Sequence, residues 1–245
     1  MPEHELWVTA LFNKYLAGLA NWILSLAGVA VEHPDKPWAN YVTMQFVVAL
    51  IVIVVFAILK PRLSVDRPGK MQHVFEIIYD FLGGQADEVV GHHGRHYLHL
   101  FATIFLFVLL GNLLGLIPSF ESPTMFPPVP LGIALVTFCY YNIMGVRAQG
   151  LGGYLKHFCG PMPLMAPLMV PIEIISHVGR LLSLTVRLYA NMFAGEQVTL
   201  VFMGLVPLVV PAVFMGLHVF VAFLQAFVFA LLTMIYTSGA VSHEH

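Results

Sequence analysis

The chain has 245 residues, of which 59% are hydrophobic and only 10% are charged, and its formal net charge is −2. A soluble domain carries about 25% charged residues, so this composition excludes an ordinary soluble protein. The near-neutral charge excludes a basic nucleic-acid surface, and the two cysteines, Cys139 and Cys159, supply no disulfide framework or paired metal motif. The apolar runs are continuous rather than alternating, which predicts membrane-crossing helices instead of a β-barrel.

Residues 1–38 predict a segment that lies at the membrane surface. Residues 5–28 mix apolar side chains with polar ones such as Asn13 and Lys14, a pattern typical of an amphipathic helix in the interface. No basic n-region or small-residue cleavage site precedes this helix, so we expect no cleaved signal peptide. A proline-containing loop at 33–37 then leads into the membrane.

The first crossing is predicted over residues 41–60. Its run from 41 to 59 carries no charge and is long enough to cross about 30 Å of hydrocarbon. Basic residues follow this run at once, and such a cluster indicates the cytoplasmic side of a membrane helix. The cluster consists of Lys60, Arg62, Arg67 and Lys70.

Two further elements follow before the last third of the chain. Residues 69–95 predict a second amphipathic helix, because acidic residues are interspersed among Val, Phe and Ile. Residues 98–146 predict a helical hairpin with crossings at 98–117 and 131–146. The segment between these crossings contains Glu121 and no lysine or arginine, which predicts that it lies on the side opposite the basic cluster.

Residues 162–238 predict a long tilted hairpin. Its first apolar stretch, 162–203, would form a helix of roughly 60 Å, twice the thickness of a bilayer. Such a helix must tilt steeply or lie partly in the membrane plane. Pro207 and Pro211 should interrupt it before a final crossing at 213–236. The prediction is an all-α integral membrane protein, a single domain of five crossings plus interfacial helices, with its N-terminus outside and its C-terminus in the cytoplasm.

A stripe of polar residues runs along the helix predicted at 162–203. At about 100° per residue, its members fall within roughly 80° of one another. A charged arginine at the membrane centre costs roughly 3 kcal/mol by insertion scales, so we expect a functional role for Arg187 rather than simple hydrogen bonding between helices. On the last helix, His218 and Gln225 are seven residues apart and share a face. The stripe consists of Glu173, His177, Arg180, Arg187 and Asn191.

Two sequence motifs resemble those of the a subunit of the rotary F-type ATP synthase, the membrane stator of its F0 sector. They are SHVGRLLSLTVRLYANMFAGE at 176–196 and HVFVAFLQAF at 218–227. The resemblance extends over roughly residues 40–240 and includes GNLLGLIP, SPT and the amphipathic GKMQHVFEIIYDFL. It implies a subunit without a catalytic site, which offers two offset half-channels and couples proton flow to ring rotation and ATP synthesis.

The resemblance also implies roles for individual residues. Arg187 matches the family's essential arginine, which faces the ion-binding carboxylate of the rotating c-ring. Asn191 and Gln225 match polar neighbours of that arginine. Glu196 and His218 match a titratable pair in the half-channel of the outer side. The cytoplasmic half-channel is matched by Glu173, Ser176 and Ser183.

The same resemblance implies partners and a location. The partners are the c-ring, the peripheral-stalk b subunits and the lipid bilayer, without nucleic acid, cofactor or metal, in a bacterial inner membrane. The ring's own site decides between proton and sodium, although Glu196 and His218 favour protons. Three positions depart from the family pattern. Gly115 stands where some members carry an acid, and Tyr189 and Ala190 stand where members often carry Phe and Gly.

Two other functional classes remain open on the residues alone. A haem-bearing membrane cytochrome would use His177 and His218 as axial ligands, and a Soret band would reveal it. A secondary ion or solute transporter would bind its substrate with charged residues at the midplane, although such proteins usually show two similar halves and this chain does not.

Two charged features lie outside these assignments. The histidines near 92–99 could hold a metal, but a headgroup-facing patch is favoured because no carboxylate is placed as a further ligand. Arg180 lies seven residues after Glu173 on the same stripe, and the structural role of pairing with it is slightly favoured. The histidines are His92, His93, His96 and His99.

Overall fold

The computed structural model describes residues 5–26, 34–91, 94–117, 119–159, 166–205 and 209–241. These residues form helices and short 3-10 turns, with no strand among them. The helices are α1 (Trp7–Leu26), α2 (Asn40–Leu59), α3 (Lys70–Val90), α4 (Leu98–Leu114), α5 (Pro128–Cys159), α6 (Ala166–Leu205) and α7 (Val209–Val241). The turns are η1 (Lys60–Arg62), η2 (Gly94–Tyr97) and η3 (Pro123–Met125).

Five of the helices are long and apolar enough to cross a membrane, which confirms the all-α class and the expected number of crossings. The candidate crossings are Asn40–Arg62, Gly94–Leu114, Pro128–Gly150, Pro167–Leu205 and Val210–Val241. Among the described helices, α1 and α3 do not meet these criteria. Both were predicted as interfacial helices.

The structure corrects the predicted end of the third crossing. Helix α5 continues past residue 146 to Cys159, with a break at Gly150. The backbone there has φ 73° and ψ 161°, a conformation that glycine adopts without steric cost. The polar residues after 146 therefore belong to a helical extension rather than to a loop.

The structure also corrects the start of the last crossing. Helix α7 begins at Val209, and Pro211 lies inside its first turn instead of separating it from α6. Proline is tolerated there because the first backbone N–H groups of a helix have no partner within that helix. Pro207 lies outside the described residues.

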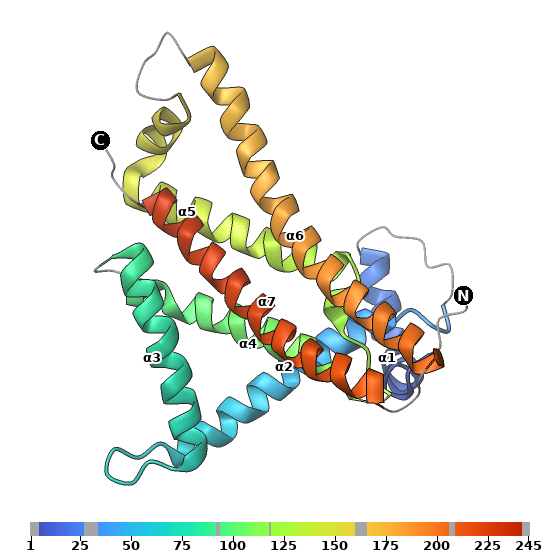
Figure 1. Ribbon diagram of the computed structural model, residues 1–245. Helices are drawn as coiled ribbons and strands as arrows, with labels where there is room; N and C mark the ends of the chain where they lie inside the picture. The colour runs from blue at the N-terminus through green and yellow to red at the C-terminus, as the bar shows by residue number, and fades with distance from the viewer. Residues whose placement is uncertain are drawn as a thin grey trace.

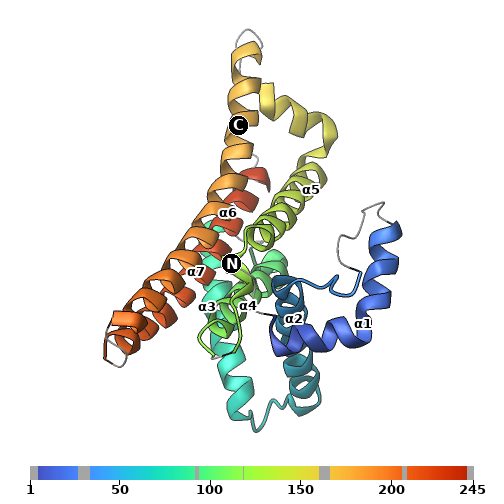
Figure 2. The same cartoon turned by 90° about the vertical axis from the view of Figure 1, so that its right-hand side faces the viewer.

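Helices α4 to α7 form the centre of the molecule, and α6 and α7 run side by side as its longest pair (Figures 1 and 2). Buried alanines recur every four residues along α7 at Ala222, Ala226 and Ala230. Small residues at this spacing allow neighbouring helices to approach closely. Phe101 and Phe105 of α4 belong to the same buried core as these last two alanines.

The N-terminal half is more open. Helices α2 and α3 diverge from their connecting loop like the arms of a V (Figure 1). Helix α1 is attached to the start of α2, where the Thr9 and Thr43 hydroxyls are 2.9 Å apart. Trp7 of α1 also packs edge-on against Phe120, which lies on the segment between α4 and α5.

Candidate ion-translocation site

Arg187 lies near the middle of α6 on an exposed face. Its Nη2 lies 3.3 Å from the Ser183 hydroxyl oxygen, and it forms no ion pair among the described residues. The opposite face of α6 is buried through Leu188 and Met192. Most other exposed side chains of this helix are apolar, although Ser183 and Asn191 are exposed as well, which leaves a charged group within a surface that membrane or another protein must cover. Its exposed apolar residues include Ile175, Val178, Leu182, Val186 and Phe193.

A compact group of polar residues, here the Tyr141 cluster, lies nearer the start of α6. The Glu173 carboxylate is 3.4 Å from Nε2 of His177 and 4.0 Å from Nη2 of Arg180. The Nδ1 atom of His177 forms a 2.7 Å hydrogen bond with the Tyr141 hydroxyl. The Arg180 guanidinium also lies 5.3 Å from the ring centre of Tyr236 on α7. The Tyr141 cluster consists of Tyr141, Glu173, His177 and Arg180.

The Tyr141 cluster borders a cavity of about 60 Å³, large enough for a few water molecules. Tyr154 and Gln149 of α5 also line it, together with Gly239 and Ala240 of α7. The Tyr154 hydroxyl donates a 2.6 Å hydrogen bond to Asn142 Oδ1, and burial raises the pKa of the Tyr154 phenol. Tyr154 therefore stays a neutral donor. Ser176, which the resemblance assigns to the same half-channel, does not line this cavity.

A second and larger cavity, here the Glu196 cavity, lies toward the other end of α6. It has a volume of about 250 Å³ and contains both Glu196 and His218 on its wall. Gly115 and Ser122, from the segment after α4, form the opposite wall. A Cβ atom on Gly115 would lie 2.8 Å from Cβ of Ser122, so a larger residue would not fit without movement. The two titratable residues expected in one half-channel are thus brought together.

His218 separates the Glu196 cavity from a third cavity of about 230 Å³, which also contains Asn191 and Gly195. A Cβ atom on Gly195 would lie 3.1 Å from Nδ1 of His218, so glycine leaves the room that the imidazole occupies. The Nε2 atom of His218 is buried without a hydrogen-bond partner in the described part of the chain. A buried polar atom of this kind usually forms a hydrogen bond with an ordered water molecule, or it exchanges a proton.

Glu121 adds a carboxylate beside this cavity that sequence reasoning did not assign. Its Oε2 accepts a 3.4 Å hydrogen bond from Asn40 Nδ2, and Glu121 lies close enough to Glu196 for electrostatic interaction. The Ser122 hydroxyl donates to the Gly111 carbonyl oxygen at 3.1 Å, which fixes the next residue of this segment. The absence of basic residues around Glu121 indicated the side of the membrane on which it lies. Its contact with Asn40 could not be predicted, because the two residues are 81 positions apart in the sequence.

Comparisons with known proteins identify the family of the chain. The family described as ATP synthase A chain matches residues 42–238. The chain is 62% identical to ATP synthase subunit a of Solibacter usitatus, over 96% of this chain and all of the relative. It is 48% identical to ATP synthase subunit a of Koribacter versatilis over the full length of both. The chain belongs to the ATP synthase subunit a family.

Membership in the ATP synthase subunit a family assigns the chain to F0 as its non-catalytic, proton-translocating stator subunit. The chain is a multi-pass protein of a bacterial inner membrane. A further relative, ATP synthase subunit a of a Sulfurihydrogenibium species, is 44% identical over 84% of this chain and 99% of its own length. The resemblance seen in the sequence motifs is confirmed.

The geometry argues against the haem alternative for this subunit a family member. His177 lies beside Arg180, whose guanidinium packs on Tyr236 of α7. His218 precedes Tyr236 by 18 residues on α7, roughly 27 Å along a helix. Two axial ligands of one haem must both reach the same iron atom. One haem cannot bridge these two histidines.

The remaining predicted residues are distributed as follows. Gln225 is half-buried on α7, two turns beyond His218, without a contact to Arg187 among the described interactions. Nδ1 of His99 is 3.0 Å from the carbonyl oxygen of His96. His92 and His93 lie outside the described residues. Within the described residues, no group of three or more His, Cys, Asp or Glu is arranged to hold a metal.

Proposed function

We propose that Arg187 separates two proton paths that enter α6 from opposite sides of the membrane. The observation that carries the proposal is the position of Arg187 between the Tyr141 cluster and the Glu196 cavity. Glu173 precedes Arg187 by 14 residues and Glu196 follows it by nine, which correspond to roughly 21 Å and 14 Å along a helix. The cavities at the two ends share no lining residue.

The path on the outer side runs through the Glu196 cavity. Glu121 and Glu196 provide carboxylates, and His218 provides an imidazole that can exchange a proton through either ring nitrogen. Asn191 borders the next cavity, one helical turn from Arg187. Protons entering this path would reach the exposed face of α6 beside Arg187.

The path on the cytoplasmic side runs from the Tyr141 cluster. Glu173 and His177 are its titratable groups, and Ser176 and Ser183 extend it along α6 toward Arg187. Arg180 balances the charge of Glu173 at 4.0 Å and is a structural member of this cluster. Gln225 orients the guanidinium of Arg187 without adding a charge when a ring is bound.

The exposed apolar face around Arg187 is suited to contact the c-ring. A ring carboxylate surrounded by lipid is stable when protonated, whereas beside Arg187 it is stable as an anion. The arginine keeps its charge and repels protons, so it favours proton release to one path and blocks direct leakage between the two. Each charge that crosses gains about 2.3 kcal/mol per 100 mV, which drives rotation once its direction is fixed.

The proposed orientation places the N-terminus outside and the C-terminus in the cytoplasm. The basic cluster begins at the end of α2, with Lys60 and Arg62 in η1. In the predicted topology, Arg147 of α5 lies on the same side of the membrane as this basic cluster. The peripheral-stalk b subunits remain expected partners on the other lipid-exposed helices. Protons are the coupling ion that the Glu196 and His218 pair favours.

The test is Arg187→Lys, measured by ATP-driven proton pumping in inverted membrane vesicles. Lysine lacks the planar guanidinium and can lose its proton when desolvated, so we expect coupled pumping to fall to background. Arg147→Lys, an exposed arginine of α5, is the matched control and should pump normally. Normal pumping by Arg187→Lys in an assembled complex would refute the proposal.

A further inference from the structure

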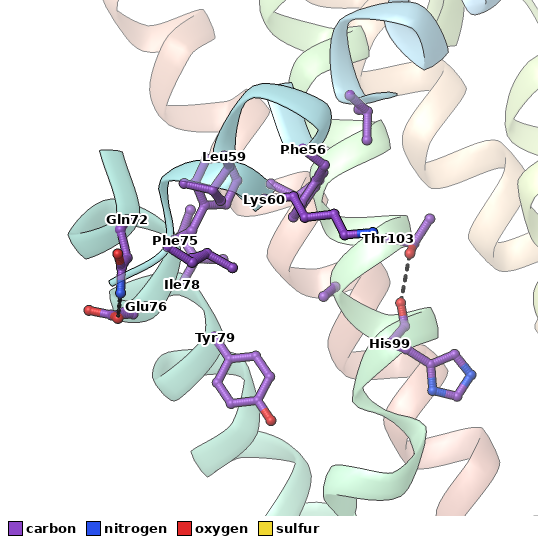
Figure 3. Close-up of a pocket in the computed structure, with 14 residues that line it drawn as sticks. Phe56, Leu59, Lys60, Gln72, Phe75, Glu76, Ile78, Tyr79, His99 and Thr103 are labelled. Carbon is purple, nitrogen blue, oxygen red and sulfur yellow. Dashed lines mark hydrogen bonds between the residues drawn. The ribbon is translucent and has the colours of Figure 1, made fainter. Parts of the chain in front are cut away.

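A cavity larger than those that border the proposed proton paths lies away from them. It has a volume of about 560 Å³ and is bounded by α2, α3 and α4 (Figure 3). Most of its wall is apolar, and Phe56 of α2 contacts Phe75 of α3 at a ring distance of 5.2 Å. On the α4 side the wall consists of His99, Ala102, Thr103 and Leu106. The cavity therefore lies where the V formed by α2 and α3 meets a buried crossing helix.

One cation lies at the rim of this cavity. Lys60, at the end of α2, lines the cavity and extends toward α4 in Figure 3. Glu76 lines the same cavity, but its Oε1 accepts a 2.8 Å hydrogen bond from Gln72 and its Oε2 lies 3.2 Å from His73. Within the described residues, Lys60 has no ion pair. A positive group therefore lies beside an apolar cavity and is not paired with any described carboxylate, Glu76 of the same wall included.

The size of the cavity limits what can occupy it. An α-helix with its side chains is about 10 Å across and rises about 5.4 Å per turn, so a volume of about 560 Å³ holds little more than one turn. A crossing helix of a partner subunit could place little more than one turn inside it. The volume does lie within the range of small-molecule sites, about 300–1,000 Å³. A flexible acyl chain meets this limit and matches the apolar wall.

The position of the cavity identifies the rest of the ligand. The end of α2 carries the basic cluster, so the rim lies at the membrane surface where lipid headgroups are found. Basic pockets at this depth attract anionic lipids. We propose that this cavity binds one acyl chain of an acidic phospholipid, with Lys60 contacting its headgroup. The bound lipid would fill the space between α2 and α3 and hold these helices at a fixed angle.

The test uses the intact ATP synthase containing this chain, reconstituted with a phosphatidylglycerol that carries a photoreactive group in its acyl chain. We expect labelling of peptides from α2, α3 and α4. Unlabelled phosphatidylglycerol should compete about fivefold better than phosphatidylcholine, the factor expected from one lysine near the surface. Lys60→Gln should remove this preference, whereas Lys70→Gln, which changes the same charge outside the cavity wall, should keep it.

A second pair of variants tests the acyl-chain site. Ala102→Phe places a ring into the cavity and should reduce labelling several-fold, whereas Ala57→Phe on the exposed side of α2 should not. Copurification with the c-ring verifies assembly of each variant. The proposal is overturned by equal competition of the two lipids, by equal effects of Lys60→Gln and Lys70→Gln, by unchanged labelling in assembled Ala102→Phe, or by a partner helix crosslinked to the cavity wall in place of lipid.

Discussion

The two ends of α6 carry similar types of polar residue, but these residues have described hydrogen-bond partners at one end and lack them at the other. In the Tyr141 cluster, His177 is only 8% exposed and contacts both Tyr141 and Glu173, so each polar group has a partner within the chain. Around the Glu196 cavity, the carboxylate and His218 border open volume, and Nε2 of His218 has no described partner. Partnered groups fix a structure, whereas polar groups beside open volume are available to water and protons. Both ends border a cavity and both belong to a proposed proton path, so the difference lies in the partners of the polar groups. We therefore expect substitutions near Tyr141 to reduce stability in addition to any effect on transport, and substitutions near Glu196 to act mainly on transport.

The strongest test of this difference is Gly195→Leu. Its side chain would occupy the space of the His218 imidazole, so we expect a loss of roughly a hundredfold or more in ATP-driven proton pumping, since a positioned proton-transfer group contributes about a hundred- to ten-thousandfold. Gly204→Leu adds the same side chain to α6 where no atom lies within 4 Å of the new Cβ, and it should pump normally. Equal pumping by both variants would remove His218 from the proposed path.

The next test addresses the Tyr141 cluster through Arg180→Ala. The change removes one of the two partners of Glu173 and the contact with Tyr236, so we expect a loss of about 1–2 kcal/mol in stability. Thermal dissociation of the solubilised complex would measure it. Arg62→Ala, an exposed arginine without a described ion pair, is the control. If Arg180→Ala abolished pumping at unchanged stability, Arg180 would be a transport residue and the contrast between the two ends would fail.

A smaller effect is expected at Glu121, the residue before Ser122 of the Glu196 cavity wall. Glu121→Gln removes one carboxylate and keeps an acceptor for Asn40, so proton-driven ATP synthesis should fall only a few-fold because Glu196 remains. The change should raise the dependence of the rate on outer pH. Glu88→Gln, an exposed carboxylate on α3, is the matched control. Identical rates for both variants would show that Glu121 does not take part in proton entry.

The fold could be predicted from the sequence where a single run of residues contains the signal. The charge-free stretch that became α2 is such a case, and the prediction of its ends differs by one residue from Asn40–Leu59. The extension of α5 was missed because Arg147 and Gln149 make it polar, although Gln149 Nε2 donates to the Ala240 carbonyl oxygen at 3.0 Å and so joins α7. Hydrophobicity indicates depth in the membrane, not the end of a helix.

In the candidate site too, the residues on a single helix could be predicted from the sequence, and those contributed by other segments could not. The stripe on α6 was visible because Glu173, Arg187 and Asn191 repeat with the period of one helix. Tyr141 and Glu121 were not visible, because they reach α6 from other helices and segments at sequence separations that no periodicity records. The roles carried by the resemblance, including those of Ser176 and Gln225, remain predictions that variants must test.

The smallest expected effect concerns α1, which is attached near the mouth of the Glu196 cavity through Trp7 and Phe120. The Lys36 ammonium, followed by the Asn13 amide, holds the pKa of Glu5 below its usual value. Because the pKa of Glu5 is lower in the folded protein, the stabilisation from its ion pair with Lys36 is fully present above about pH 4.3. It is lost as the pH falls through the lowered pKa. The protection factors of the α1 amides, which are hydrogen-exchange rates corrected for the intrinsic rate at each pH, should therefore fall on acidification, at most about fivefold since the pair is partly exposed. Lys36→Gln should move that fall to higher pH and Lys14→Gln should not, and the same midpoint in both would show that this ion pair does not attach α1.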